Sequence, residues 1–263
     1  MNETIVYEVA DGVATITLNR PERRNALNLE AYEALEAALR RVVRDPAARC
    51  AIVTGADPAF CSGDDVIELM ATPRPPSEDS PVVRHRPTPA AMAALECDKP
   101  LIAAVNGPAM GWGMELALYA DVRIASERAR FAELFIKRGL VADVGGFTRL
   151  PAIVGPSKAA ELLFTGDAID AAEALRIGLV SEVAPHDELM ARAGALAARI
   201  AAGPPLALRY MKEGLRRGVH GEPREVGAWA IETIRKLMRT EDHKEGVAAF
   251  LEKRAPIWAR REP

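Results

Sequence analysis

Short apolar segments, each followed by a turn and then a helical pattern, recur along the first two thirds of this chain. Cys50–Thr54 ends at Gly55, Leu101–Val105 ends at Asn106-Gly107-Pro108, and Asp121–Ala125 is a third such segment. Apolar runs of about five residues that alternate with helical patterns favour buried strands in an α/β fold. We therefore expect stacked units of strands and a helix that bury their apolar faces on one another. The residues themselves show no strong internal repeat.

The first strands are predicted to form a hairpin that leads into a helix. Ile5–Val9 and Val13–Leu18 alternate apolar and polar residues, with Asp11-Gly12 between them, which is typical of a hairpin with a primed turn. Asn28 is a good N-cap for a helix whose apolar positions repeat at helical spacing to about Arg44.

The pattern changes after Ser181. Four amphipathic helices are predicted, over 187–202, 205–217, 222–239 and 242–253, and no strand is expected among them. We expect residues 1–185 to form a catalytic core and 186–263 a helical oligomerisation region. Trp229, Ile231, Ile234 and Leu237 are expected to be buried between subunits.

Composition excludes several classes of protein. The 263 residues are 49% hydrophobic with a net charge of −3, which favours a large buried core over disorder. Only 5% are aromatic, so we expect no nucleic-acid partner. The three cysteines, Cys50, Cys61 and Cys97, have no metal-binding spacing, and no apolar stretch reaches the roughly 20 residues that span a bilayer. We expect a cytoplasmic protein without a bound metal.

One segment departs from this regular alternation. Residues 72–89 hold six prolines, mixed charge and few apolar side chains. A long loop of this kind is either a functional lid or a surface insertion, and the sequence does not separate the two.

Three glycine-containing segments carry polar side chains that chemistry can use. They are 59–65, 106–117 and 139–147. A helix that begins near Gly113 would expose unpaired N–H groups, and Asp65 could cap a second short helix. Two N–H groups aimed at one carbonyl oxygen would form an oxyanion hole, with the Glu115 carboxylate within one turn. Such glycine turns also serve as packing devices, and Asp143 could equally be a turn residue or a helix cap.

These segments and others resemble the crotonase superfamily, also called the enoyl-CoA hydratase/isomerase family, over the whole chain. The motifs that carry the resemblance are Leu18-Asn19-Arg20-Pro21, Asn25-Ala26-Leu27, Ala59-Phe60-Cys61-Ser62-Gly63, Ala104-Val105-Asn106-Gly107, Glu115-Leu116-Ala117, Asp121-Val122-Arg123, Arg149-Leu150-Pro151, Val154-Gly155, Ala174 to Val183 and Phe250-Leu251-Glu252-Lys253-Arg254.

The resemblance implies an α/β spiral of ββα units followed by a helical trimerisation region, in a homotrimer or homohexamer. It implies an acyl-CoA substrate and no separate cofactor. The thioester oxygen would lie between the backbone N–H groups of Ser62 and Trp112, and Trp112 departs from the family's usual glycine. The residues implied to bind CoA or the acyl group are Arg23, Arg24, Cys61, Asp65, Phe135, Phe250 and Lys253. For Arg23 and Arg24 a solvated loop is the alternative.

The reaction depends on the acids beside the acyl chain. Glu115 matches the first of the two glutamates that the family's hydratases use, but the second position holds Phe135, which cannot exchange a proton. Glu133 lies two residues earlier, and the sequence does not say where its side chain points. Asp143 matches an aspartate of the family's dienoyl-CoA isomerases.

We therefore expect double-bond isomerisation by Glu115 and Asp143. The alternative is hydration of a 2-enoyl-CoA with Glu115 as the main acid–base group. An aryl-CoA dehalogenase or hydrolase, or an RNA-binding relative, fits the residues less well.

Overall fold

The computed structural model describes residues 3–71 and 87–258. Most of the proline-rich segment, residues 72–86, lies outside the described residues, and so does its interpretation as a lid or an insertion. The strands are β1 (Ile5–Ala10), β2 (Val13–Leu18), β3 (Cys50–Gly55), β4 (Leu101–Val105), β5 (Pro108–Met110), β6 (Val122–Ser126), β7 (Arg130–Ala132), β8 (Ile169–Asp170) and β9 (Glu182–Ala184). The helices are α1 (Leu29–Arg44), α2 (Val66–Leu69), α4 (Pro89–Glu96), α5 (Trp112–Tyr119), α6 (Leu150–Val154), α7 (Pro156–Thr165), α8 (Ala171–Arg176), α9 (Leu189–Ala201), α10 (Pro205–His220), α11 (Pro223–Leu237) and α12 (Glu241–Glu252), with shorter turns η1 (Pro21–Arg23), η2 (Leu134–Arg138), η3 (Gly145–Arg149) and η4 (His186–Glu188).

The predicted hairpin and first helix are confirmed. β1 pairs antiparallel with β2, and the turn residues Asp11 and Gly12 both have positive φ, at 50° and 82°, as a primed turn requires. Asn28 caps α1 by accepting a hydrogen bond from the Ala31 N–H at 3.0 Å. These two local signals, the turn at Asp11-Gly12 and the cap at Asn28, set where the hairpin turns and where α1 begins.

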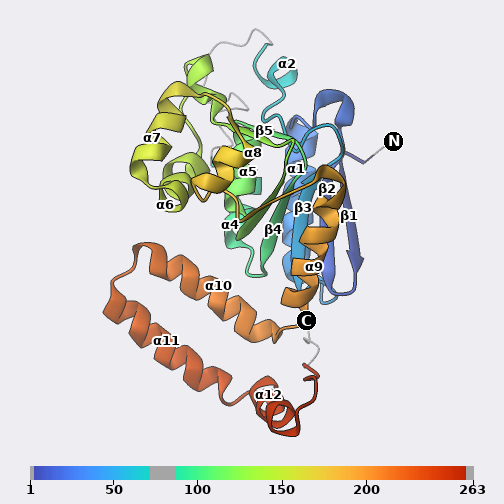
Figure 1. The fold of residues 1–263 in the computed structure, drawn as a ribbon, viewed down its shortest axis with the longest axis vertical. Helices are drawn as coiled ribbons and strands as arrows, with labels where there is room; N and C mark the ends of the chain where they lie inside the picture. The colour runs from blue at the N-terminus through green and yellow to red at the C-terminus, as the bar shows by residue number, and fades with distance from the viewer. Residues whose placement is uncertain (1–2, 72–86, 259–263) are drawn as a thin grey trace.

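A six-stranded sheet organises the core, in the order β1-β2-β3-β4-β6-β9, and every pair after the hairpin is parallel. Its central strands β3 and β4 are buried along their whole length. Side chains of β3 alternate between the two faces: Cys50 and Ile52 pack with α9, whereas Ala51 and Val53 join the larger cluster that includes α1, α4 and α5. Figure 1 shows the sheet between α9 and this group of helices.

A second, three-stranded sheet lies beside the first, in the order β5-β7-β8. β5 pairs parallel with β7, and the register sets Met110 opposite Ala132. This small sheet fixes the segment that leads from β5 into α5.

The region after Ser181 differs from the prediction in two ways. It contains a strand, β9, which pairs with β6, so the expectation that this region lacks strands is wrong. Three residues are too few to show a strand pattern in sequence. In addition, α9 packs on the sheet, where Leu189, Ala193, Ala197 and Ala201 are buried.

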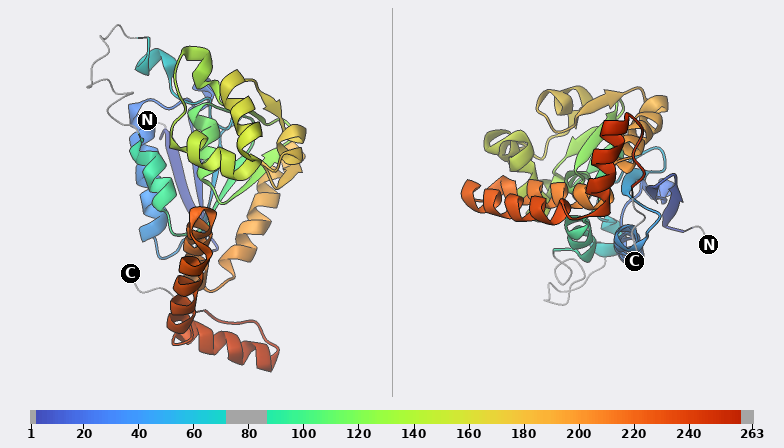
Figure 2. Two further views of the ribbon diagram at one scale, coloured as in Figure 1. Left: turned by 90° about the vertical axis from the view of Figure 1, so that its left-hand side faces the viewer. Right: turned by 90° about the horizontal axis from the view of Figure 1, so that it is seen from below.

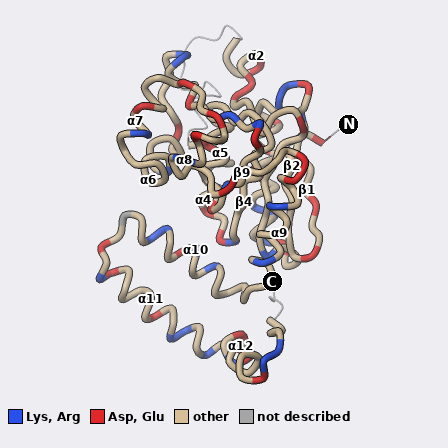
Figure 3. Tube along the Cα trace, viewed as in Figure 1, with Lys and Arg blue, Asp and Glu red and all other residues tan. Residues whose placement is uncertain are grey.

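Helices α10 to α12 extend away from the core (Figures 1 and 2). Their predicted bounds are confirmed within a few residues. Buried Lys212 attaches α10 to the core: its Nζ lies 2.7 Å from Asp121 Oδ2 and 2.7 Å from the Lys99 carbonyl oxygen. Charges of both signs are mixed along the three helices (Figure 3).

His186 connects two edges of the core. Its Nδ1 lies 3.1 Å from Ser126 Oγ and its Nε2 lies 3.0 Å from Asp57 Oδ2. Asn106 Nδ2 also donates to Asp57, and this hydrogen bond is the main reason that the pKa of Asp57 is lowered. The contacts join the turn after β3 to the end of β6.

None of the described helices combines the length and the apolar character needed to cross a membrane. Within residues 3–71 and 87–258, no three His, Cys, Asp or Glu side chains are grouped as metal ligands.

Candidate active site

Two strand ends lie side by side at the centre of the core, and they come from separate predicted segments. Cys61 forms a parallel bridge with Ala109, and the Met110 N–H donates to the Cys61 carbonyl oxygen at 2.9 Å. The approach is close, because a Cβ on Gly113 would collide with the Cys61 carbonyl oxygen. Glycine at position 113 therefore lets the start of α5 rest directly on the 61–63 segment.

The start of α5 presents the backbone of Trp112. Gly111 precedes the helix with a φ of 53°, and its N–H donates to the Ala132 carbonyl oxygen at 2.7 Å. Trp112 is the first residue of the helix, so its N–H has no carbonyl one turn back to bond with. Its side chain is 1% exposed and meets Tyr32 edge-on, with ring centroids 4.9 Å apart. The core thus accommodates the large side chain at the position where the resemblance implies a glycine.

The structure corrects the expectation for Ser62. The Ser62 N–H donates to the Arg24 carbonyl oxygen at 3.1 Å, so it is already used inside the protein. The Asp64 N–H is the better candidate for the oxyanion hole. Leu27 forms a bridge with Asp64 through the two neighbouring residues: the Leu27 N–H donates to the Gly63 carbonyl oxygen, and the Asp65 N–H donates to the Leu27 carbonyl oxygen. In a parallel bridge of this kind the N–H of the middle residue points away from the partner strand. Ser62, Asp64 and Trp112 all line a pocket of about 20 Å³, which is room for one water, so it is the direction of the N–H group that favours Asp64.

Sequence reasoning missed Asp64 because side-chain type carries no information about which backbone N–H faces a pocket. Backbone N–H groups alternate in direction along an extended segment. The N–H that faces the pocket could therefore be identified once the pairing of one residue in the segment is known. That pairing, between Leu27 and Asp64, appears only in the folded chain.

Asp65 has a structural task. It is 4% exposed, it caps α2 by accepting from the Glu68 N–H, and its Oδ2 lies 3.2 Å from Arg20. The predicted cap is therefore confirmed. Its predicted contact with substrate has no support from these bonds, since they occupy the carboxylate.

Arg23 and Arg24 are exposed and lie beside the 61–64 segment. The Arg23 carbonyl accepts from Ser62 Oγ at 3.4 Å, and Arg24 has a φ of 51° at the end of η1. Cys61 is fully buried, which raises the pKa of its thiol to about 12 and leaves it protonated. The backbone of both arginines thus lies against the 61–64 segment, their contact with CoA stays a prediction, and Cys61 is a buried packing residue.

Glu115 lies at the centre of a ring of donors. Its Oε1 accepts from the N–H groups of Asp143 at 2.7 Å and Gly146 at 3.2 Å, and its Oε2 accepts from the Gly145 N–H at 3.2 Å and the Tyr119 hydroxyl at 2.9 Å. The side chain is 0% exposed. Burial raises the pKa of Glu115 to about 7, helped by the charge of Asp143 and opposed by the Tyr119 hydrogen bond.

Asp143 is brought to Glu115, as predicted. It is 8% exposed, and its Oδ1 accepts from the Val144 N–H at 2.8 Å. The Asp143 backbone N–H donates to Glu115, and the charge of the Asp143 side chain contributes to the raised pKa of Glu115.

Phe135 and Glu133 occupy neighbouring places on the segment after β7. Phe135 is 8% exposed and lines the small pocket with Gly111 and Trp112. Glu133 is 1% exposed, and burial followed by the charge of Glu115 raises its pKa well above the ordinary value. The site therefore holds a third carboxyl group that the sequence did not place.

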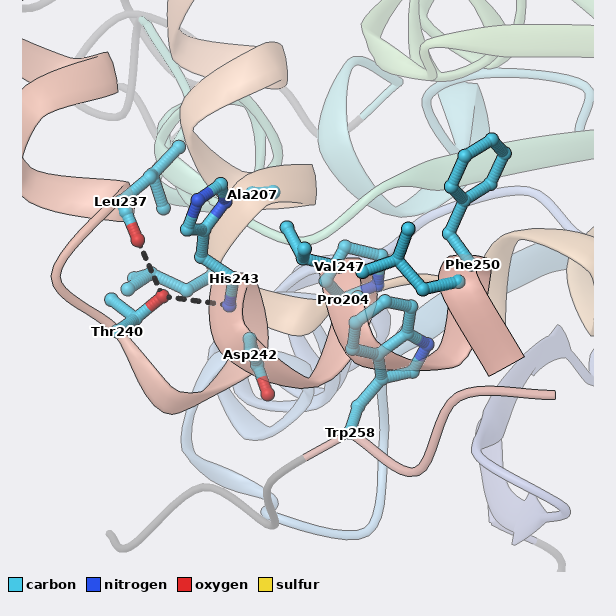
Figure 4. A pocket seen from close by; sticks show the side chains of 12 residues that line it. Pro204, Ala207, Leu237, Thr240, Asp242, His243, Val247, Phe250 and Trp258 are labelled. Atoms are coloured by element: carbon cyan, nitrogen blue, oxygen red, sulfur yellow. Dashed lines mark hydrogen bonds between the residues drawn. The ribbon is translucent and has the colours of Figure 1, made fainter. Parts of the chain in front are cut away.

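Phe250 and Lys253 are far from these groups in sequence: Phe250 lies on α12, at the end of the extended helices, and Lys253 follows the helix as its C-cap residue. Phe250 is 82% exposed and lines an apolar pocket of about 470 Å³ built wholly from residues after 203, together with Leu237, His243 and Trp258 (Figure 4). Within one chain, the structure does not bring Phe250 or Lys253 to Glu115. Their contact with CoA stays a prediction about a neighbouring subunit.

The fold and the site together define a class of protein: an α/β spiral with buried carboxyl groups beside a helix start that presents a backbone N–H. A family model described as enoyl-CoA hydratase/isomerase matches residues 8–261. The chain belongs to the enoyl-CoA hydratase/isomerase family and is an enzyme of the lyase or isomerase type.

Individual relatives agree with this assignment. The chain is 38% identical to (E)-benzylidenesuccinyl-CoA hydratase of Thauera aromatica over an alignment of 256 residues, which covers 97% of this chain and 98% of that protein. It is 35% identical to 1,2-epoxyphenylacetyl-CoA isomerase of Escherichia coli over 257 residues, which cover 97% of this chain and 98% of that protein. The solved enoyl-CoA hydratase of Bacillus anthracis is 33% identical with a TM-score of 0.92, covering 98% of this chain and 100% of that one.

Proposed function

We propose that this enzyme moves a double bond along the acyl chain of an unsaturated acyl-CoA, with Glu115 and Asp143 as its acid–base groups. The observation that carries the proposal is the buried Glu115 carboxyl, whose pKa of about 7 lets it both take and give a proton at neutral pH. Asp143 lies in the segment between η2 and η3, where its backbone N–H donates to Glu115, and we assign its carboxyl as the second proton-transfer group. An isomerase needs one such group at each end of the π-system.

The thioester would be held by backbone groups. We assign the oxyanion hole to the N–H groups of Asp64 and Trp112, which line one small pocket. Negative charge that develops on the thioester oxygen is stabilised there, which makes the adjacent carbon acidic. The buried surroundings strengthen these hydrogen bonds relative to water.

Hydration of a 2-enoyl-CoA is the second candidate. It is favoured by the name of the Thauera relative, a hydratase that shares 38% of its residues with this chain. In this case Glu115 would activate water and Asp143 would assist. Phe135 still prevents the two-glutamate arrangement that the resemblance implies for hydratases.

The remaining expectations concern binding and assembly. Arg23 and Arg24 are proposed to bind CoA phosphates, and Phe250 and Lys253 to reach the CoA of a neighbouring subunit. Exposed apolar side chains on the tail helices support a homotrimer or homohexamer, among them Met211 at 68%, Leu215 at 70% and Ile231 at 53% exposure. We propose a cytoplasmic enzyme that needs no cofactor besides its CoA thioester substrate.

A turnover screen over a panel of unsaturated acyl-CoAs, read by mass, tests the proposed reaction. Isomerisation leaves the mass unchanged and shifts the double bond, whereas hydration adds one water. We expect Glu115→Gln and Asp143→Asn each to slow isomerisation by about 10²–10⁴-fold. Glu33→Gln, on the exposed face of α1, is the matched control and should act as wild type. Full isomerisation by Asp143→Asn would contradict the proposed role of Asp143.

A further inference from the structure

The indole N–H of Trp112 is a buried donor without an acceptor. Trp112 is 1% exposed, and its Nε1 has no hydrogen-bond partner among the described residues. A buried tryptophan N–H usually finds a partner, and even the partly exposed Trp258 donates its indole N–H to the Ala202 carbonyl oxygen at 2.6 Å. Natural proteins keep few unpaired donors in their interior, because such groups destabilise the fold. The Trp112 indole therefore lacks an acceptor that a bound molecule could supply.

Two tyrosines connect this indole to the candidate active site. Tyr32 meets it edge-on, with ring centroids 4.9 Å apart, and the Tyr32 hydroxyl donates to Asp64 Oδ1 at 2.5 Å. The ring centroid of Tyr119 is 6.1 Å away, and the Tyr119 hydroxyl donates to Glu115 Oε2 at 2.9 Å. The indole is thus one aromatic contact from the residue assigned to the oxyanion hole and one from the main acid–base group.

The acyl group of the proposed substrate has to pass this indole. Its thioester oxygen would lie at the Trp112 backbone N–H, and its reacting carbons would lie within reach of the Glu115 carboxyl. Residues 112 and 115 are neighbours on one face of α5, because they are three positions apart in a helix. Trp112 also lines the small pocket, together with Asp64 and Phe135. Since one residue carries both N–H groups, an acceptor for the indole would lie only a few bonds from the thioester carbonyl.

We propose that the Trp112 indole N–H binds an oxygen atom on the third or fourth carbon of the acyl group. The preferred substrate is then an unsaturated acyl-CoA that carries a keto, ether or hydroxyl oxygen near the thioester, and a plain hydrocarbon chain is a poorer one. The inference rests on the proposed function, because it needs an acyl-CoA whose thioester is held at Asp64 and Trp112.

An unpaired donor discriminates between acyl groups of the same shape. An oxygen-bearing group gives the indole an acceptor that the free enzyme lacks, so no existing hydrogen bond inside the protein is lost in exchange. A hydrocarbon group of equal size leaves the donor buried and unpaired. We expect the oxygen-bearing acyl-CoA to bind about 10–100-fold more tightly.

Saturated acyl-CoA pairs test this preference without a double bond to move. In each pair the oxygen of one member is replaced by carbon in the other: 4-oxopentanoyl-CoA with 4-methylpentanoyl-CoA, and 3-methoxybutanoyl-CoA with 3-methylpentanoyl-CoA. Isothermal titration calorimetry should give the lower Kd for the oxygen-bearing member of at least one pair. Equal Kd values within both pairs would overturn the proposal.

A single substitution shows whether the indole causes the preference. Trp112→Phe removes the indole N–H and keeps an aromatic ring and the backbone N–H, so the ratio of the two Kd values should fall to about one. Trp229→Phe makes the same change on α11, outside the candidate site, and should keep the wild-type ratio. A ratio that survives in Trp112→Phe would show that another group recognises the oxygen.

NMR of the indole N–H groups gives a readout that does not depend on the folding of Trp112→Phe. The chain has three tryptophans, so Trp229→Phe and Trp258→Phe identify the Trp112 signal by elimination. Hydrogen bonding deshields the proton, so this signal should move downfield with the oxygen-bearing ester and not with its hydrocarbon partner. The same shift with both members of each pair would overturn the proposal.

Failure of the proposed function gives a different result. An enzyme that binds no acyl-CoA of either pair would refute the proposed function, and the role of the indole with it. An enzyme that binds both members of each pair equally would refute the role of the indole alone.

Discussion

Glu115 shows how burial outweighs hydrogen bonding at a single residue. Four donors surround its carboxyl, and each favours the ionised form, yet its pKa is raised to about 7. The loss of solvation and the nearby charge of Asp143 are therefore the larger effects. The donors hold the carboxyl in place, while burial makes it basic.

The pH dependence of kcat/KM should follow this balance. If Glu115 must be ionised to act, activity falls below about pH 7, since protonation removes the base. Tyr119→Phe removes a hydrogen bond that lowers the pKa of Glu115, so the acid limb should move to higher pH. Asp143→Asn removes a charge that raises this pKa, so the limb of the residual activity should move to lower pH. Shifts in the same direction in both variants would contradict the assignment of the limb to Glu115.

Residue identity singled out Glu115 and Asp143, because a carboxyl in an apolar or glycine-rich segment is a rare choice, and the structure places both in the interior and in contact. It did not predict which N–H groups face the pocket. The Ser62 and Asp64 amides differ only in direction, and direction depends on the pairing with Leu27. The burial of Glu133 was equally hidden, since it depends on the packing around β7.

At the scale of elements, local signals predicted where helices and strands begin. Asn28 and Asp65 cap α1 and α2 as expected, and the hairpin formed at Asp11-Gly12. Elements fixed by distant contacts were missed. β9 forms through its pairing with β6, and η3 is held to α5 where its Gly145 and Gly146 N–H groups bond to Glu115.

The contact between α5 and the 61–63 segment gives a prediction for two glycines. Gly113→Ala places a Cβ against the Cys61 carbonyl oxygen, which must move the helix start. We expect a loss of about 1–3 kcal/mol in unfolding free energy, by denaturant unfolding, together with weaker acyl-CoA binding. Gly194→Ala on α9 is the control, because nothing lies within 4 Å of a Cβ at this position. Alanine is favoured over glycine inside a helix, so the unfolding free energy of this variant should rise by about 0.5–1 kcal/mol. Equal effects at both glycines would show that close packing is unimportant here.

At the scale of the whole molecule, the three tail helices expose several large apolar side chains. Phe250 is 82% exposed, Leu251 74% and Leu215 70%. Large exposed apolar patches mark interaction sites. Together with α10, which buried Lys212 anchors to the core, this surface fits contact with other copies of the chain.

Light scattering should therefore find a trimer or hexamer at micromolar concentration. Leu215→Asp adds a charge to the exposed face of α10 and should dissociate the assembly while leaving circular dichroism unchanged. Leu29→Asp changes a partly exposed leucine, 44% exposed, at the start of α1 and should leave the assembly intact. A monomeric wild-type protein would refute both the assembly and the role of Phe250 and Lys253 at a neighbour's CoA.

His186 joins Ser126 to Asp57 in an arrangement that resembles a catalytic triad. Ser126, His186 and Asp57 are linked in a chain like that of a serine-hydrolase triad, but the two ring nitrogens are exchanged: Nδ1 faces Ser126 and Nε2 faces Asp57. Yet Ser126 is 0% exposed and its hydroxyl oxygen also accepts from the Arg128 N–H, so no ester could reach it. The burial of Ser126 thus excludes it as a nucleophile, and the three residues serve to join the turn after β3 to the end of β6.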